Sequence, residues 1–216
     1  AKQKAAVHCV IIGFSQKDDA FNKIIYSDGT PKKVKNINPY LLDGETVFIE
    51  SKSKPLCDVP AIRKGNQPTD GGNLIIEASE LDEFLEKEPL AQKYIKRLVG
   101  AKEYINSLDR YCLWLINVPP SELRKMPLVM ERVKKVKEMR LSSSDKGTQK
   151  LADYPTLFRE TNNPKTFIVV PSVSSENRKY IPMGFLDENT IPTNLVLIIP
   201  EASLYHFGIV TSNVHM

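Results

Sequence analysis

The chain has 216 residues, a length that suits one large domain or a domain with part of a second. Hydrophobic residues make up 41% of the chain, and no apolar run approaches the roughly twenty residues that a membrane helix needs. The net charge of +4 is mild, so composition permits a polyanionic partner without requiring one. The three cysteines, Cys9, Cys57 and Cys112, have no pair spacing, which fits reduced thiols in the cytoplasm.

The first part of the chain predicts strands and turns. The apolar, β-branched run Ala5–Phe14 predicts a strand that is buried on both faces. Turn residues follow at Ser27–Pro31, and Thr46–Ile49 predicts a short strand. Because the apolar run starts almost at residue 1 and Val214–Met216 reads as structured, we expect the chain to be a segment of a longer polypeptide.

Helices are predicted in the middle of the chain, after a loop from Pro55 to Asn73 that is rich in proline and glycine. Ser79 is expected to cap one helix, and Pro89 to end that helix and begin a second one that stops at Gly100. The run Tyr111–Asn117 predicts a buried strand.

A longer helix is predicted from Pro127, between two short ones at Ser121–Lys125 and Leu151–Phe158. Its core face is expected to consist of Val129, Val133 and Val136. The final third predicts three strands, which are Thr166–Val170, Tyr180–Leu186 and Leu195–Ile199. The predicted fold class is α+β, with mixed strands, a helical middle section, and a separate strand in front.

A basic helix is the first candidate binding element. From Arg124 to Arg140 the chain has seven basic residues and only two acidic ones, a larger excess than that of the whole chain. Such a positive stripe is typical of a surface that binds DNA phosphates, although a solvated helix face has the same composition. The predicted phosphate contacts are Lys134, Lys137, Arg140 and Lys150.

The second candidate binding element is the polar segment that follows the predicted strand Thr166–Val170. Hydroxyl, amide and guanidinium groups follow one another between Pro171 and Leu186, and such groups donate to phosphates and to base edges. The alternative is an ordinary polar hairpin. The side chains predicted to contact DNA are Ser174, Ser175, Arg178, Lys179 and Tyr180, and we expect this loop to lie beside the basic helix.

Two other functions are compatible with the residues. Asp43, Glu50 and Lys52 have the carboxylate, carboxylate and lysine pattern of a metal-dependent nuclease, although that spacing also arises by chance. Alternatively, the basic helix could dock an acidic protein, which would make the chain a protein-interaction fragment. A methyl-transfer site is not expected: Asn38-Pro39-Tyr40 lacks a second proline, and no glycine-rich cofactor loop precedes it.

Long ordered blocks of the chain resemble the MmeI-type DNA methyltransferases. These enzymes are single-chain restriction–modification proteins with a nuclease domain, a helical connector, an adenine-N6 methyltransferase and a target-recognition domain. The blocks are Ile37–Leu41 (INPYL), Ser53–Ile76 (SKPLCDVPAIRKGNQPTDGGNLII), Arg110–Leu115 (RYCLWL), Val170–Leu186 (VPSVSSENRKYIPMGFL) and Leu204–Met216 (LYHFGIVTSNVHM).

The resemblance implies an organisation for the chain. Residues 1–54 would be the end of the methyltransferase-like region and a connector, residues 55–203 the target-recognition domain, and residues 204–216 the start of the segment that leads out of it. The family has Arg where this chain has Asn177, so a base contact is not carried over to that position, whereas Arg178 and Tyr180 stay in register.

The resemblance also implies partners and cofactors. Double-stranded DNA and the rest of the parent polypeptide are the expected partners, and the parent is expected in the cytoplasm. S-adenosylmethionine, and Mg²⁺ for any nuclease activity, would bind to the parent enzyme and not to this segment. We therefore expect the segment to recognise DNA and to carry no catalytic or metal-binding residues of its own.

Overall fold

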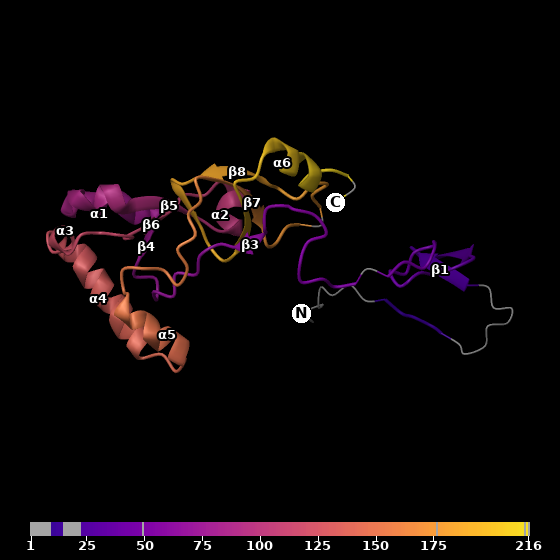
Figure 1. Ribbon diagram of the computed structural model, residues 1–216, viewed down its shortest axis with the longest axis horizontal. Coiled ribbons are helices and arrows are strands. Elements are labelled where there is room, and N and C mark those ends of the chain that lie inside the picture. The colour runs from indigo at the N-terminus through magenta and orange to yellow at the C-terminus, as the bar shows by residue number, and fades with distance from the viewer. Residues whose placement is uncertain (1–9, 15–22, 49, 176, 214, 216) are drawn as a thin grey trace, which may run out of the picture. The chain divides into compact units, whose positions relative to one another are not determined.

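A computed structural model describes residues 10–14, 23–48, 50–175, 177–213 and 215 (Figure 1). The chain divides into two units, Ala1–Cys57 and Asp58–Met216, which we call unit 1 and unit 2. No helix in the described part of the chain is long and apolar enough to cross a membrane.

Unit 1 contains a β-hairpin of β1 (Lys23–Ser27) and β2 (Thr30–Val34). The two residues between the strands, Asp28 and Gly29, have φ angles of 50° and 79°. Left-handed backbone at both positions matches the right-handed twist of a two-residue hairpin, and Gly adopts it without strain. The turn predicted at Ser27–Pro31 is therefore confirmed.

The two strands predicted in unit 1 are not seen among its described residues. Val10–Phe14 has no strand pairing, and Ile11 and Phe14 are 99% and 95% exposed. Thr46–Phe48 is likewise unpaired. A strand is stabilised only by a neighbour that completes its hydrogen bonds, and the described part of unit 1 supplies none here. Residues 5–9 and Ile49 lie outside the described residues.

The first sheet of unit 2 has the strand order β4-β6-β5-β9. It consists of β4 (Ile75–Glu77), β6 (Arg110–Leu113), β5 (Ile95–Val99) and β9 (Thr190–Pro192), and only the pair of β5 and β9 is parallel. The main hydrophobic core lies against this sheet and includes Trp114 and Phe158.

Helices near this sheet differ partly from the prediction. The first is α1 (Leu81–Lys87), which follows a 3₁₀ turn at Ala78–Glu80, so Ser79 does not cap it. The segment from Pro89 is a 3₁₀ helix only to Tyr94, and the second half of the predicted helix is strand β5. Pairing with β6 and β9 on both sides provides hydrogen bonds that outweigh the local helical pattern.

The longer predicted helix is confirmed as α4 (Pro127–Leu141), with Val129, Val133 and Val136 buried. It follows the short helix α3 (Pro120–Leu123). Beyond it lie α5 (Lys146–Lys150) and a 3₁₀ turn at Leu151–Asp153, so Leu151–Phe158 is mostly irregular instead of helical. The strand predicted at Tyr111–Asn117 ends early, at Leu113.

The second sheet of unit 2 is antiparallel, in the order β3-β10-β7-β8. Its strands are β3 (Arg63–Lys64), β10 (Val196–Pro200), β7 (Thr166–Pro171) and β8 (Gly184–Asp187). Strands β7 and β10 were predicted, whereas the segment Tyr180–Leu186 joins the sheet only from Gly184 onward.

Helices pack on both faces of the second sheet. Phe167 and Val169 of β7 contact one core cluster that includes Ala101 of α2 (Ala101–Asn106). Ile168 belongs to another cluster, against which Phe207 of α6 (Leu204–Val210) packs. This alternation follows from the two-residue period of a strand. The mixed α+β class is confirmed; the strand expected in front of it is not seen in the described residues.

Candidate nucleic-acid interface

The loop between β7 and β8 exposes every DNA-contacting side chain predicted in it. Ser174, Ser175, Arg178, Lys179 and Tyr180 all lie at the surface. The backbone folds on itself there: the amide of Arg178 donates to the carbonyl of Ser175 at 3.0 Å, and the amide of Asn177 donates to Ser175 Oγ at 3.2 Å. A closed turn of this kind presents polar side chains outward, as a recognition loop requires.

Tyr180 connects this loop to the end of unit 2 that carries α6. Its hydroxyl donates to Asn213 Oδ1 at 3.3 Å, and Lys179 Nζ lies 5.4 Å from the centre of its ring. The ring is 45% exposed and Val173, at the start of the loop, is 65% exposed. Hydroxyl, ammonium and guanidinium donors therefore occur together with an apolar surface, a combination that can contact phosphates, base edges and the thymine methyl group.

Arg140 does not belong to the surface on which it was predicted. It is 1% exposed and donates five hydrogen bonds, all to main-chain carbonyls. Burial lowers its pKa, which nearby Asp70 opposes. A guanidinium whose donors are all used inside the protein cannot neutralise a phosphate. The prediction that Arg140 contacts DNA is corrected on this ground. Its five acceptors are the carbonyls of Pro68, Thr69, Leu151, Tyr154 and Leu157.

Other charges of α4 are also partly used within the protein. Arg132 donates to the carbonyls of Asn73 and Ile75 at 3.2 and 3.0 Å, and lies over the ring of Phe84. Lys134 is paired with Glu138 at 3.8 Å. Lys137 and, on α5, Lys150 are exposed without an ion pair among the described residues, and Lys134 is exposed beside its ion pair with Glu138.

The loop and the basic helix do not lie beside one another. In Figure 1, α4 and α5 lie at one end of unit 2, and α6, which the loop contacts through Tyr180, lies at the other. The expectation that the loop lies beside the basic helix was wrong, because separation along the sequence does not give the distance between a helix and a loop in space. Any DNA that contacts both must extend along the unit.

The residues of the nuclease alternative do not form a metal site. Asp43 is paired with Lys32 at 3.0 Å, and no three His, Cys, Asp or Glu side chains among the described residues are placed to hold an ion. The INPYL segment is a turn closed by Asn38, whose Oδ1 accepts from the amides of Tyr40 and Leu42. The nuclease alternative therefore finds no support in the described part of the chain.

The glycine pair of unit 2 does not provide a site for a methyl-donor cofactor. Gly71 and Gly72, at φ 62° and 81°, form the turn before β4. The amide of Gly72 donates to Asp70 Oδ1 at 3.1 Å, and the amide of Leu74 to Asp70 Oδ2 at 2.6 Å. The Asp70 carboxylate therefore takes the position that an anionic group of a cofactor would need, so these residues do not fit S-adenosylmethionine.

Sequence reasoning missed a third element, the irregular segment 154–163, whose first half was predicted to be helical. Its Phe158 is buried against Trp114, with ring centroids 5.2 Å apart, and the next residue, Arg159, is exposed. An aromatic residue followed by an arginine in a polar stretch was the available signal. The pattern was too short to separate a buried anchor from a helical turn.

Comparison with known proteins identifies the class of this domain. The family model described as "MmeI, target recognition domain" matches residues 43–216. The chain therefore belongs to the MmeI target recognition domain family.

Two larger proteins are similar to this chain over most of its length. It is 45% identical over 217 residues to DNA methyltransferase A of Bacillus subtilis (strain 168), an alignment that covers 100% of this chain and 25% of that protein. It is also similar to a solved structure of the Type IIL restriction–modification enzyme MmeI in complex with DNA, with a TM-score of 0.80 and 42% identity. That match covers 90% of this chain and 27% of the other, so the chain spans about a quarter of the length of each relative.

Proposed function

We propose that this chain recognises a specific DNA sequence for a larger adenine-N6 DNA methyltransferase of the restriction–modification type. The observation that carries the proposal is the exposed, turn-closed loop Ser174–Tyr180 in a domain of the target-recognition family. Arg178 reads or orients the duplex from this loop. Ser174, Ser175, Lys179 and Tyr180 contact backbone and bases around it.

Charge at the other end of unit 2 supplies the second part of the interface. Lys134, Lys137 and Lys150 neutralise phosphates and contribute affinity that does not depend on sequence. Because these lysines and the loop lie at opposite ends of unit 2, the duplex runs along the unit. This arrangement fixes the register of the DNA while the rest of the parent polypeptide acts on it.

The chain consists of three parts of the parent polypeptide. Residues 1–54 belong to the methyltransferase-like region and its connector, residues 55–203 are the target-recognition domain, and residues 204–216 begin the segment leading out of it. The division of the chain between Cys57 and Asp58 supports the first boundary. The packing of α6 against the second sheet ties the start of the last segment to the domain.

The parent would use S-adenosylmethionine as methyl donor, on an adenine extruded from the duplex. The donor, and Mg²⁺ for any nuclease activity, would bind outside this chain. The amides of Gly72 and Leu74, which could otherwise hold an anionic group of the donor, donate to Asp70. The cytoplasm is the proposed location, which suits the free thiols of Cys57 and Cys112.

Fluorescence anisotropy with the 216-residue chain, and methylation assays with the full parent enzyme, test the proposal. Wild-type chain should bind duplex DNA weakly, in the micromolar range or above, with an affinity that falls steeply as salt rises. In the parent, Arg178→Ala should reduce methylation at least about tenfold. Arg124→Ala, which removes an exposed arginine from the end of α3, is the matched control and should leave methylation near wild type.

The absence of salt-sensitive DNA binding at low ionic strength, together with full activity of the Arg178→Ala parent, would refute this function. Preferential capture of an acidic protein instead of DNA would favour the protein-interaction alternative.

A further inference from the structure

Two segments of unit 2, residues 66–70 and 151–163, are irregular apart from the 3₁₀ turn at Leu151–Asp153. Neither belongs to a sheet ladder over most of its length, yet each is pinned at several points by buried groups. We call them the anchored loops. Polar loops fixed in this way are the segments on which proteins place residues that need exact positions.

Buried groups fix the first half of the 151–163 loop. Arg140 donates to the carbonyls of Leu151, Tyr154 and Leu157 at 2.9, 2.9 and 2.7 Å. Phe158 is 3% exposed and meets Trp114 edge to face. The main chain immediately before residue 159 is therefore held by hydrogen bonds and by core packing at the same time.

Asn66, which is completely buried, fixes the second half. Its amide nitrogen donates to the carbonyl of Asn162 at 2.8 Å, and its Oδ1 accepts from the amide of Asn162 at 2.6 Å. The same amide nitrogen reaches the carbonyl of Pro192 at 3.0 Å, which ties the loop to β9. Gly65 allows this approach, because a Cβ there would lie 2.3 Å from the carbonyl oxygen of Thr193.

Between these two anchors the chain presents Arg159 to solvent. The amide of Arg159 donates to the carbonyl of Gln67 at 3.0 Å, and its side chain is 46% exposed. Arg159 Nε lies 3.5 Å from Glu160 Oε1, while Glu160 Oε2 accepts from the amide of Gln67 at 2.9 Å. Glu160 thus orients the guanidinium from its Nε side. The two terminal nitrogens have no hydrogen-bond partner among the described residues.

We propose that Arg159 is a specificity-determining residue that contacts guanine in the major groove. The inference rests on the proposed DNA-recognition function and adds a base-reading position that the Ser174–Tyr180 loop does not supply. The two terminal nitrogens form a planar fork that matches O6 and N7 of guanine. The main chain at Arg159 is held, and Nε lies beside Glu160, so the guanidinium can present both terminal nitrogens to one base and discriminate between bases.

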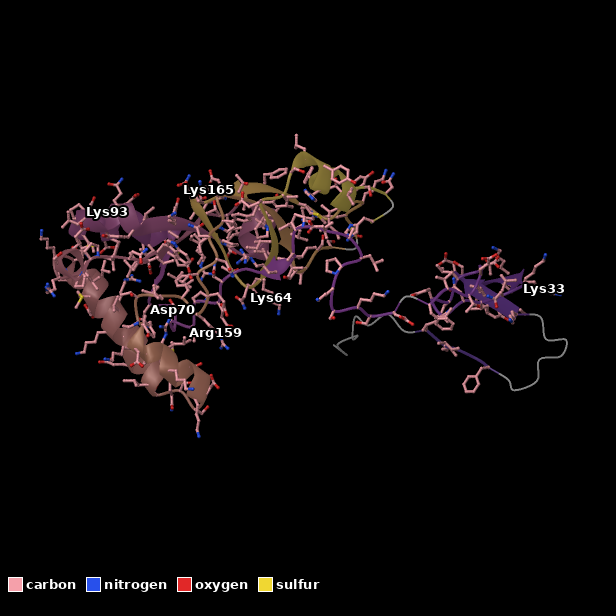
Figure 2. The ribbon with its side chains drawn as sticks, in the orientation of Figure 1. Lys33, Lys64, Asp70, Lys93, Arg159 and Lys165 are labelled. Atoms are coloured by element: carbon pink, nitrogen blue, oxygen red, sulfur yellow. The ribbon has the colours of Figure 1, made fainter. Side chains whose placement is uncertain are left out.

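The surroundings of Arg159 fit this role. In Figure 2, Arg159 and Lys64 lie along one edge of unit 2, and Lys165 lies along the opposite edge. Arg63 and Lys64 of β3 are exposed, as is Lys150, which directly precedes the anchored segment. These three cations can hold phosphates on either side of a base pair that Arg159 contacts.

The experiment uses the full parent enzyme and begins by determining its methylation motif by single-molecule sequencing of DNA from cells that express it. Dissociation constants are then measured for the motif duplex and for duplexes in which each G·C pair is replaced in turn. With wild type, the replacement at the Arg159 contact should weaken binding about tenfold or more. With Arg159→Ala, the motif duplex should weaken by that factor and the replaced duplex should not weaken further.

Arg159→Lys separates base reading from charge. Lysine keeps the positive charge but lacks the fork, so this variant should lose the same discrimination as Arg159→Ala while keeping the salt dependence of wild type. Lys165→Ala, a charge removed from the opposite edge, is the control and should keep discrimination at every position. Thermal unfolding should be close to wild type in all three variants, since both side chains are exposed.

Equal weakening on all duplexes, unchanged binding, or wild-type discrimination by Arg159→Lys would each overturn the inference. These results differ from a failure of the proposed function, in which the wild-type parent would show no preferred DNA sequence at all.

Discussion

Helix α4 and the loop Ser174–Tyr180 are both rich in cationic side chains, but the protein uses their charge in opposite ways. On α4, Arg140 and Arg132 point into the domain and donate to main-chain carbonyls. In the loop, the side chain of Arg178 is exposed and has no hydrogen-bond partner in the described part of the chain. A positive stripe in a sequence is therefore not by itself a binding surface.

The difference between Arg140 and Arg178 follows from the groups that surround each side chain. The carbonyls that surround Arg140 lie in loops and in a 3₁₀ turn, and among the described residues only those of Leu151 and Tyr154 also accept from a backbone amide. A buried five-donor guanidinium satisfies several of these carbonyls at once. The loop needs no such group because its turn is closed by its own serine. Four measurements test this difference between the two regions, and Arg140→Ala is expected to produce the greatest change.

Arg140→Ala should produce the largest change in stability. It removes five hydrogen bonds and leaves the carbonyls of Pro68, Thr69 and Leu157 without a donor among the described residues, so we expect the free energy of unfolding to fall by about 4 kcal/mol. Urea unfolding monitored by the fluorescence of Trp114 measures this loss. If the variant had normal stability but had lost DNA affinity, Arg140 would contact phosphate instead. The difference drawn here between α4 and the loop would then be wrong.

Arg132→Ala should cost less, because that side chain is 26% exposed and donates to two carbonyls. We expect a loss of about 1–2 kcal/mol in the free energy of unfolding, part of it from the contact with the Phe84 ring. The same unfolding assay applies, with Lys135→Ala on the exposed face of α4 as control. A loss as small as that of the control would mean that these hydrogen bonds contribute little.

Acid should weaken the N-terminus of α5, where Asp145 is the capping residue. The hydrogen bonds from the hydroxyl and amide of Thr148 hold the pKa of Asp145 below its ordinary value. A lowered carboxyl pKa stabilises the fold above the ordinary value of 3.8, and this stabilisation is lost as pH falls through the folded-state pKa. The melting temperature of wild type should exceed that of Asp145→Asn near neutral pH, and the gap should close in acid. A gap independent of pH would contradict this assignment.

Lys137→Ala should have the smallest effect. Its side chain is exposed, so stability should change by less than about 0.5 kcal/mol. If it contacts one phosphate, the slope of log affinity against log salt should decrease by about 1 for all duplexes alike. Sequence-dependent weakening would be inconsistent with a phosphate contact. Lys165→Ala, which removes an exposed cation outside the basic helix, is the control and should leave the salt slope unchanged.

Local sequence patterns predicted α4, β7 and β10 but missed strand β5. The valines of α4 were readable because their burial follows the period of a helix, and β7 and β10 were readable because each is a nearly continuous apolar run. Strand β5 was read as helix because its pairing partners lie elsewhere in the chain. The exposure of Ser174, Ser175 and Asn177–Tyr180 was predictable because a run of six polar residues cannot be buried without partners.

Neighbouring residues alone specify the α+β class, the family blocks and the polar segment between β7 and β8. Which arginines are buried and which are exposed depends on the tertiary structure. Arg140 is buried because its acceptors include carbonyls 71 and 72 residues away. Arg159 is presented because Asn66 fixes Asn162 from 96 residues away. Hydrogen bonds over such separations leave no trace in a local pattern, because they depend on how two sheets meet.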